Sequence, residues 1–312
     1  MSGSNRGRHA WRVLQALAAL IILFFLIRDV GANWEKIRAA DLAWHIRPLF
    51  LAGGVVITWG MYAMLIWTWR RFLHDWGGRL SFRTAARIWS VSSLGKYIPG
   101  KIWAIAGMAL MSQRAGVAPW AATASAILLQ GLAVGSGVVV VALADTSALE
   151  AQHPLLRPIL GLLAVGSAVG VALLVSPALS SMLLRRFMKS SAIGAPRPVT
   201  IVVGIVANLL AWIGYGVAFW LMILGTLPEA RIPLGVAIGS FTASYLAGLL
   251  FLLAPGGLGV REGAMYLMLQ GTIGPAAAAA LAIASRLMLT LTELGVAIPF
   301  LVFPGENTRV PT

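Results

Sequence analysis

A Pro-Gly dipeptide interrupts an apolar stretch at two places in the chain, Pro99-Gly100 and Pro255-Gly256. The two dipeptides are 156 residues apart, and the sequence after each follows the same pattern. The same offset relates Gly107 to Gly263, Pro119 to Pro275 and Gln130 to Arg286. Internal repeats with broken helices are typical of membrane transporters, in which the breaks form the binding site. The pattern therefore predicts a protein that moves a substrate rather than one that converts it.

The composition indicates an integral membrane protein. Of the 312 residues, 59% are hydrophobic and 11% are charged, and no polar stretch is long enough for a second domain, so residues 1–312 are expected to form a single membrane domain. The net charge of +14 comes from basic residues in loops between apolar spans, which favours contact with anionic lipid over nucleic acid. The chain has no cysteine, and its four histidines are scattered, so we expect no metal and no other cofactor.

The fold class predicted is all-α, with six full transmembrane helices. The apolar segments long enough to cross the bilayer are Val13–Ile27, which is short, Pro48–Thr68, Ala118–Ala144, Pro158–Val175, Val199–Gly225 and Ala276–Phe303. Between them lie the two Pro-Gly regions, Phe82–Arg114 and Pro233–Thr272. Each is expected to contain a helix, a break and a shorter helix.

Loop charges predict the orientation of these spans. Basic residues gather before the first span, after the second and between the fourth and fifth, which places these loops and both termini in the cytoplasm. This assignment requires each Pro-Gly region to enter and leave on the same side, as a helical hairpin, and its short second limb favours a re-entrant one. Because three spans separate the hairpins, the sequence predicts an inverted repeat, about 11–145 and 154–304, whose breaks meet in a central cavity. A cleaved signal peptide ending at Val30-Gly31-Ala32 is the alternative for the N-terminus.

The second break resembles a known family motif. Leu253-Ala-Pro-Gly-Gly-Leu-Gly-Val-Arg-Glu-Gly263 is similar to the Pro-Gly-Gly-Leu-Gly-x-Arg-Glu motif of the lysylphosphatidylglycerol synthase transmembrane-region family, also described as flippase-like. Arg286 corresponds to a buried arginine of that family. The first break, Lys96-Tyr-Ile-Pro-Gly-Lys-Ile-Trp103, departs from the usual Pro-Gly-x-x-Gly-Glu form. This departure from the usual motif concerns the identity of the substrate rather than the fold.

The resemblance covers essentially the whole chain and implies movement of a lipid with a polar headgroup across the membrane. Some relatives also make aminoacylated phosphatidylglycerol, and others stand beside genes for cell-surface glycans. The soluble aminoacyl-transfer domain of the bifunctional relatives is not expected in this chain.

Arg286 is the strongest candidate for a binding residue. It lies in the middle of an apolar span, where a charge costs about 2.5–3.5 kcal/mol on insertion scales, so it should face the protein interior. Thr290 and Glu293 lie on the same face of the helix. Either Arg286 binds the phosphate or carboxylate of a lipid, or it forms an internal ion pair with Glu293 or Glu262.

The second break supplies further candidates. Gly256, Gly257 and Gly259 bring backbone amides close to a ligand at the start of a helix, which suits phosphate, or they only allow the turn. Arg261 is either a headgroup ligand or an interface anchor. Glu262 either complements the helix dipole and pairs with Arg286, or carries protons together with Glu293.

The first break is flanked by two cations. Lys96 and Lys101 lie on either side of Pro99-Gly100, where they either contact a polar headgroup or extend to the membrane surface. Gln130, the repeat counterpart of Arg286, is expected to form a hydrogen bond between helices.

The function predicted is a flippase or transporter for an anionic lipid or lipid-linked substrate in the cytoplasmic membrane, and not an enzyme. No Gly-x-x-x-x-Gly-Lys motif is present, so transport is expected to be passive or ion-coupled. One alternative is a membrane transferase acting on a lipid-linked donor, with its base among Asp29, Glu35 and Asp41. Another is an accessory scaffold for neighbouring enzymes of a cell-surface glycan pathway.

Overall fold

The structure is a computed structural model, and it describes residues 44–98, 102–144, 155–176, 178, 182, 195–251 and 254–302. In these residues the fold is entirely helical, with short 3₁₀ segments and no strand. The first half contains α2 (Pro48–Asp75), α3 (Phe82–Ser93), the 3₁₀ segment η1 (Leu94–Tyr97), α4 (Ile102–Arg114) and α5 (Pro119–Leu143). After α7 (Leu156–Val175), the second half contains α9 (Pro198–Thr226), η2 (Pro228–Ala230), α10 (Leu234–Leu250), η3 (Pro255–Gly257), α11 (Val260–Ile273) and α12 (Pro275–Val302).

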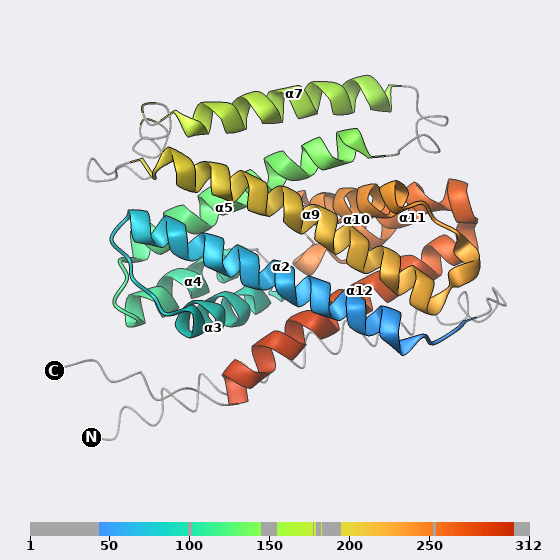
Figure 1. Ribbon diagram of the computed structural model, residues 1–312, viewed down its shortest axis with the longest axis horizontal. Coiled ribbons are helices and arrows are strands. Elements are labelled where there is room, and N and C mark those ends of the chain that lie inside the picture. The colour runs from blue at the N-terminus through green and yellow to red at the C-terminus, as the bar shows by residue number, and fades with distance from the viewer. Residues whose placement is uncertain are drawn as a thin grey trace.

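Four of the six predicted spans are confirmed as helices long and apolar enough to cross a membrane: α2, α5, α9 and α12. The predicted span Pro158–Val175 is the apolar helix α7, which contacts α5 and α9 at the edge of the molecule (Figure 1). The predicted span Val13–Ile27 lies outside the described residues. α2 continues seven residues beyond the predicted Thr68 because Trp69, Phe72 and Leu73 are fully buried in the core.

Both Pro-Gly regions contain two helices, as predicted, but the second helix is shorter only in the later region: α4 has 13 residues against 12 in α3, whereas α11 has 14 against 17 in α10. α3 packs against α4, and α10 packs against α11. α5 begins at Pro119 and α12 at Pro275, since proline at the first helical position loses no hydrogen bond. The element order after each break is therefore the same in both halves.

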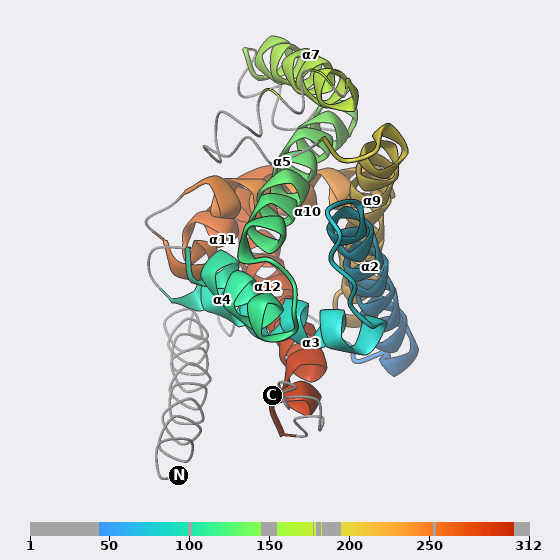
Figure 2. The ribbon, with the colours of Figure 1, turned by 90° about the vertical axis from the view of Figure 1, so that its left-hand side faces the viewer.

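The two largest hydrophobic cores correspond largely to the two halves of the chain. One core joins α2, α3, α4 and α5 around Trp69 and Phe72 and also contains Ile201 of α9, and the other joins α9, α10, α11 and α12 around Met265 and Leu269. The two halves meet along α2 and α9, which lie side by side (Figures 1 and 2). In Figure 1, α5 emerges above α9, next to α7, and α12 emerges below α2.

The alanines that match between the repeats pack in the same way. Ala121, Ala122 and Ala124 of α5 are buried, and so are their counterparts Ala277, Ala278 and Ala280 of α12. Small side chains let helix backbones approach closely where apolar surface alone gives no drive to associate in lipid. The alanine pattern is thus a packing surface that both halves use.

Candidate functional site

The two breaks lie against each other although they are far apart in sequence. The segments η1 and η3 are in contact. A Cβ atom added to Gly256 would lie only 3.0 Å from Cδ1 of Tyr97. The same position is 3.6 Å from Nη2 of Arg286. The second break therefore touches both the first break and the middle of α12.

Glycine is required at the second break by its backbone geometry. Gly256 and Gly257 have φ values of 57° and 73°, in the left-handed region that other residues seldom adopt. Gly257 also lies against α10, where an added Cβ would be 2.8 Å from Cα of Gly248. These glycines let the chain turn between α10 and α11 within a tightly packed site.

Arg286 forms the predicted ion pair with Glu262. Arg286 is buried, with 6% of its surface exposed, and its Nη1 atom donates to Oε1 of Glu262. The other carboxylate oxygen of Glu262 accepts from the backbone N–H of Gly259 at 2.7 Å, at the start of α11. Glu262 therefore occupies the helix N-terminus at which the sequence suggested a phosphate. Its ion pair with Arg286 also connects α11 to α12.

Glu293, two helical turns further along α12, binds the first break instead of Arg286. Lys96 forms an ion pair with its Oε1 atom, and the hydroxyl of Tyr97 donates to its Oε2 atom at 2.9 Å. The hydroxyl of Tyr62 on α2 lies 3.4 Å from Oε1. Lys96 thus turns inward, and Glu293 links η1 and α2 to α12.

α12 therefore holds both breaks through two separate ion pairs. The pair Arg286–Glu262 lies within the second half, whereas Lys96–Glu293 joins the first half to the second. Tyr97 connects the two, since its ring packs on Gly256 and its hydroxyl binds Glu293.

Among the described residues of the site, Arg261 is the cation without a carboxylate partner. It is 6% exposed, and its guanidinium carbon lies 5.1 Å from the ring centre of Phe241 and 5.2 Å from that of Tyr245, both on α10. Its Nε and Nη2 atoms are buried without a hydrogen-bond partner.

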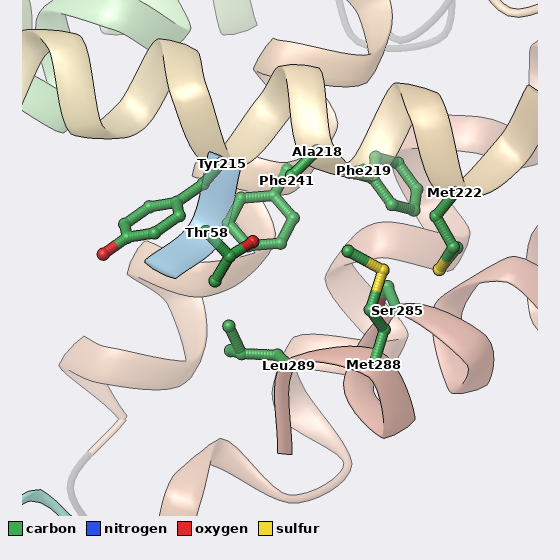
Figure 3. Close-up of a pocket in the computed structure, with 9 residues that line it drawn as sticks. All are labelled: Thr58, Tyr215, Ala218, Phe219, Met222, Phe241, Ser285, Met288 and Leu289. Atoms are coloured by element: carbon green, nitrogen blue, oxygen red, sulfur yellow. The ribbon is translucent and has the colours of Figure 1, made fainter. Parts of the chain in front are cut away.

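The breaks meet as predicted, but their contact is filled rather than hollow. Tyr97 packs directly on Gly256 where the sequence predicted a central cavity. A small cavity between α2, α9, α10 and α12 has room for about one water molecule. Apolar and aromatic side chains form most of its lining, and Thr58, Ser285 and Tyr215 contribute hydroxyl-bearing side chains (Figure 3). It is too small and too apolar for a headgroup.

Several predicted residues have other positions or lie outside the description. Pro99, Gly100 and Lys101 of the first break, and the transferase candidates Asp29, Glu35 and Asp41, lie outside the described residues. Pro255 begins η3, and Gly259 is exposed. Gln130 is exposed, unlike its buried counterpart Arg286.

The sequence did not single out four aromatic residues of the site. Tyr97 and Tyr62 bind Glu293, and Phe241 and Tyr245 hold Arg261. Tyr97 stands next to Lys96 in the first motif, and Phe241 and Tyr245 are four residues apart on one helix face. The latter spacing is a usable signal, whereas Tyr62 could be found only from the fold.

Comparison with known protein families identifies the family of this chain. Residues 12–295 match the family described as lysylphosphatidylglycerol synthase TM region. The chain belongs to this family. The lysylphosphatidylglycerol synthase TM region family is one of membrane proteins, in agreement with the four long apolar helices, and the match confirms the resemblance seen in the second break. No curated protein matches the chain.

Proposed function

We propose that this protein is a flippase, which moves an anionic lipid or lipid-linked substrate between the leaflets of the cytoplasmic membrane. One observation carries the proposal: two helix breaks 156 residues apart meet at a buried cluster of charged side chains on α12. Broken backbone at membrane depth is tolerated where protein buries it or where it lines a polar path. Charges there are costly and are typical of substrate pathways.

The family supports a role connected with lipids. Its name refers to the synthase of lysylphosphatidylglycerol, a lipid with a polar headgroup. In the proposed mechanism the headgroup passes between the two breaks while the acyl chains stay in the bilayer. Both termini are cytoplasmic, and the two hairpins enter from opposite faces as an inverted repeat. Rocking of one half against the other opens the closed contact to each face in turn.

The ion pairs favour passive exchange over proton coupling. Glu262 and Glu293, the two acidic residues of the site, are bound to Arg286 and Lys96. Proton binding by either carboxylate would first have to break an ion pair. The lipid gradient between the leaflets then supplies the drive.

Leaflet exchange in liposomes tests the proposal. Purified protein is reconstituted with a fluorescent phosphatidylglycerol, and the fraction of label open to a membrane-impermeant quencher is followed over time. We expect exchange well above that of protein-free liposomes, and a strong reduction in Arg286→Ala. The matched control is Arg83→Ala, which removes an exposed arginine of α3 and should exchange like the wild type.

Two results would contradict the proposal. One is no exchange with phosphatidylglycerol, an aminoacylated derivative or a polyprenyl phosphate. The other is turnover of a lipid-linked sugar that is lost when Asp29, Glu35 and Asp41 are replaced together, which would indicate the transferase.

A further inference from the structure

Arg261 combines burial with unfilled hydrogen-bonding capacity. The aromatic faces of Phe241 and Tyr245 attract its positive charge at about 5 Å. A ring face, however, does not supply the in-plane lone pairs that guanidinium N–H groups need at about 2.7–3.2 Å. Its Nε and Nη2 atoms remain without an acceptor. Buried donors nearly always have an acceptor in proteins, so two donors without an acceptor on one guanidinium indicate that a ligand supplies it.

The charge balance of the site indicates what that acceptor is. Lys96 is paired with Glu293, and Arg286 is paired with Glu262. Arg261 is the remaining cation of this cluster, so the described residues leave one positive charge uncompensated. A buried charge is stable only with a counter-charge, and one negative charge completes the balance.

The backbone near Arg261 reaches the protein surface at Gly259. Gly259, two residues earlier, is exposed, and the position of an added Cβ there has no atom within 4 Å. The backbone N–H of Gly259 already donates to Glu262, so the N-terminus of α11 does not supply the anchor. Because Nε and Nη2 of Arg261 are buried, a ligand reaches these donors only when the contact around them opens.

We propose that Arg261 is the residue that binds the charge of the substrate, and that its ligand is a singly charged phosphodiester of a phospholipid headgroup. Phe241 and Tyr245 hold the guanidinium, and two phosphate oxygens accept from Nε and Nη2. Arg286 is then a positioning residue that fixes Glu262 and α11. The inference deepens the proposed flippase function and rests on it for the route of the lipid.

Thermal unfolding of the purified protein in detergent micelles tests the assignment. In micelles that contain phosphatidylglycerol, the wild-type unfolding temperature should rise relative to micelles with phosphatidylcholine, whose headgroup carries no net charge. Arg261→Met should unfold at a higher temperature than the wild type without added lipid, because it removes an unpaired buried charge. It should also lose the phosphatidylglycerol shift. Arg261→Lys should keep the charge but bind phosphatidylglycerol about tenfold more weakly, since an ammonium lacks the paired donors.

The same measurement with other phosphate compounds distinguishes the possible ligands. Soluble glycerophosphoglycerol at the same concentration should give a smaller shift than phosphatidylglycerol if the acyl chains contribute, and an equal shift would assign the site to free phosphodiesters. Phosphatidic acid, a phosphomonoester that carries up to two charges, should bind more weakly. Arg83→Met, the exposed control, should behave as the wild type.

The outcomes distinguish this assignment from the flippase function. If Arg261→Met unfolds at a lower temperature than the wild type, or keeps the full phosphatidylglycerol shift, Arg261 is an interface anchor and the assignment is wrong. Exchange in liposomes that Arg261→Met leaves unchanged would have the same meaning and would leave the flippase intact. Binding that depends on Arg261 without any wild-type exchange would retain the subsite and contradict the flippase.

Discussion

Glu293 receives more partners than any other carboxylate among the described residues. Lys96, Tyr97 and Tyr62 all approach it, from η1 and α2, and Glu293 itself is 8% exposed. A carboxylate with this environment is fixed in place, and the groups around it depend on its charge. Its main effect is therefore expected in the stability of the fold.

Replacement of Glu293 by Gln should destabilise the protein by about 3 kcal/mol, because it leaves Lys96 without its counter-charge. This value is at the low end for a broken buried pair, since 26% of the Lys96 side chain is exposed. The measurement is the free energy of unfolding in mixed micelles. Glu229→Gln, which changes an exposed carboxylate, is the control and should have little effect. Equal stability of both variants would show that the pair contributes nothing.

Gly256 is the second residue with a sharp expectation. Alanine there requires a left-handed conformation, which costs about 1–2 kcal/mol, and places a methyl group 3.0 Å from the Tyr97 ring. Gly256→Ala should therefore unfold more readily and exchange lipid more slowly. Gly131→Ala, in α5 with open space around its Cβ position, should instead gain up to about 1 kcal/mol in helix stability. A Gly256→Ala protein as stable as the wild type would contradict this account of the break.

For single residues, the sequence predicted those features that depend only on the residue and on its own helix. A charge in the middle of an apolar span must be buried and paired, so the Arg286–Glu262 pair could be named as one of two options. The choice between Glu262 and Glu293 could not be made, because it depends on Lys96 reaching Glu293 across 197 positions of sequence. Tyr62 was missed for the same reason.

Among the helices, α9 and α10 make one of the closest approaches. A Cβ added to Gly216 of α9 would lie 2.5 Å from Cα of Ile238 on α10, so alanine there must push two backbones apart. A Cβ added to Gly214 also meets a neighbour at 2.5 Å, but that atom is the sulfur of the flexible side chain of Met61.

These two glycines give a matched pair of variants. Gly216→Ala should destabilise the protein by about 1–3 kcal/mol, as overpacking usually does, whereas Gly214→Ala should cost clearly less because Met61 can change its rotamer. Thermal unfolding in detergent compares the two. Equal losses of stability in the two variants would mean that the α9 and α10 backbones can move apart as easily as a methionine side chain can change its rotamer.

Helix positions were predictable because the signals are local. Proline at the start of α5 and α12, and Pro-Gly at each break, act on their own neighbours along the chain. Helix ends were less predictable, as in α2, where charged residues at Arg70 and Arg71 suggested a loop. The helix continues because Trp69, Phe72 and Leu73 pack into a core that other helices complete.

For the whole molecule, the proposed rocking motion needs the two halves to slide past each other. The chain has no cysteine, so an introduced pair forms the only disulfide. The Cβ positions of Phe50 on α2 and Gly225 on α9 are 3.1 Å apart, so a disulfide between them would join the two halves. Those of Ser92 and Gly107 are 3.5 Å apart and lie within the first hairpin. Both separations are near the usual disulfide range of about 3.5–4.5 Å.

Oxidation of the Phe50→Cys/Gly225→Cys pair should stop leaflet exchange, and a reductant should restore it. Oxidation of Ser92→Cys/Gly107→Cys should leave most of the exchange, because it joins two limbs that move together. Gel mobility after labelling of free thiols reports whether each disulfide has formed. Full exchange with the cross-half disulfide in place would exclude rocking as the mechanism.

The order of the charges along the chain has a consequence for biogenesis. α12, which contains Arg286 and Glu293, is the last described helix to be synthesised, and the partners Lys96 and Glu262 precede it. When α12 leaves the translocon, a helix with two ionised side chains must partition into hydrocarbon. By then the preceding helices already present one opposite charge for each. The nascent protein thus receives the least hydrophobic of its four long apolar described helices only after the groups that neutralise it have been made.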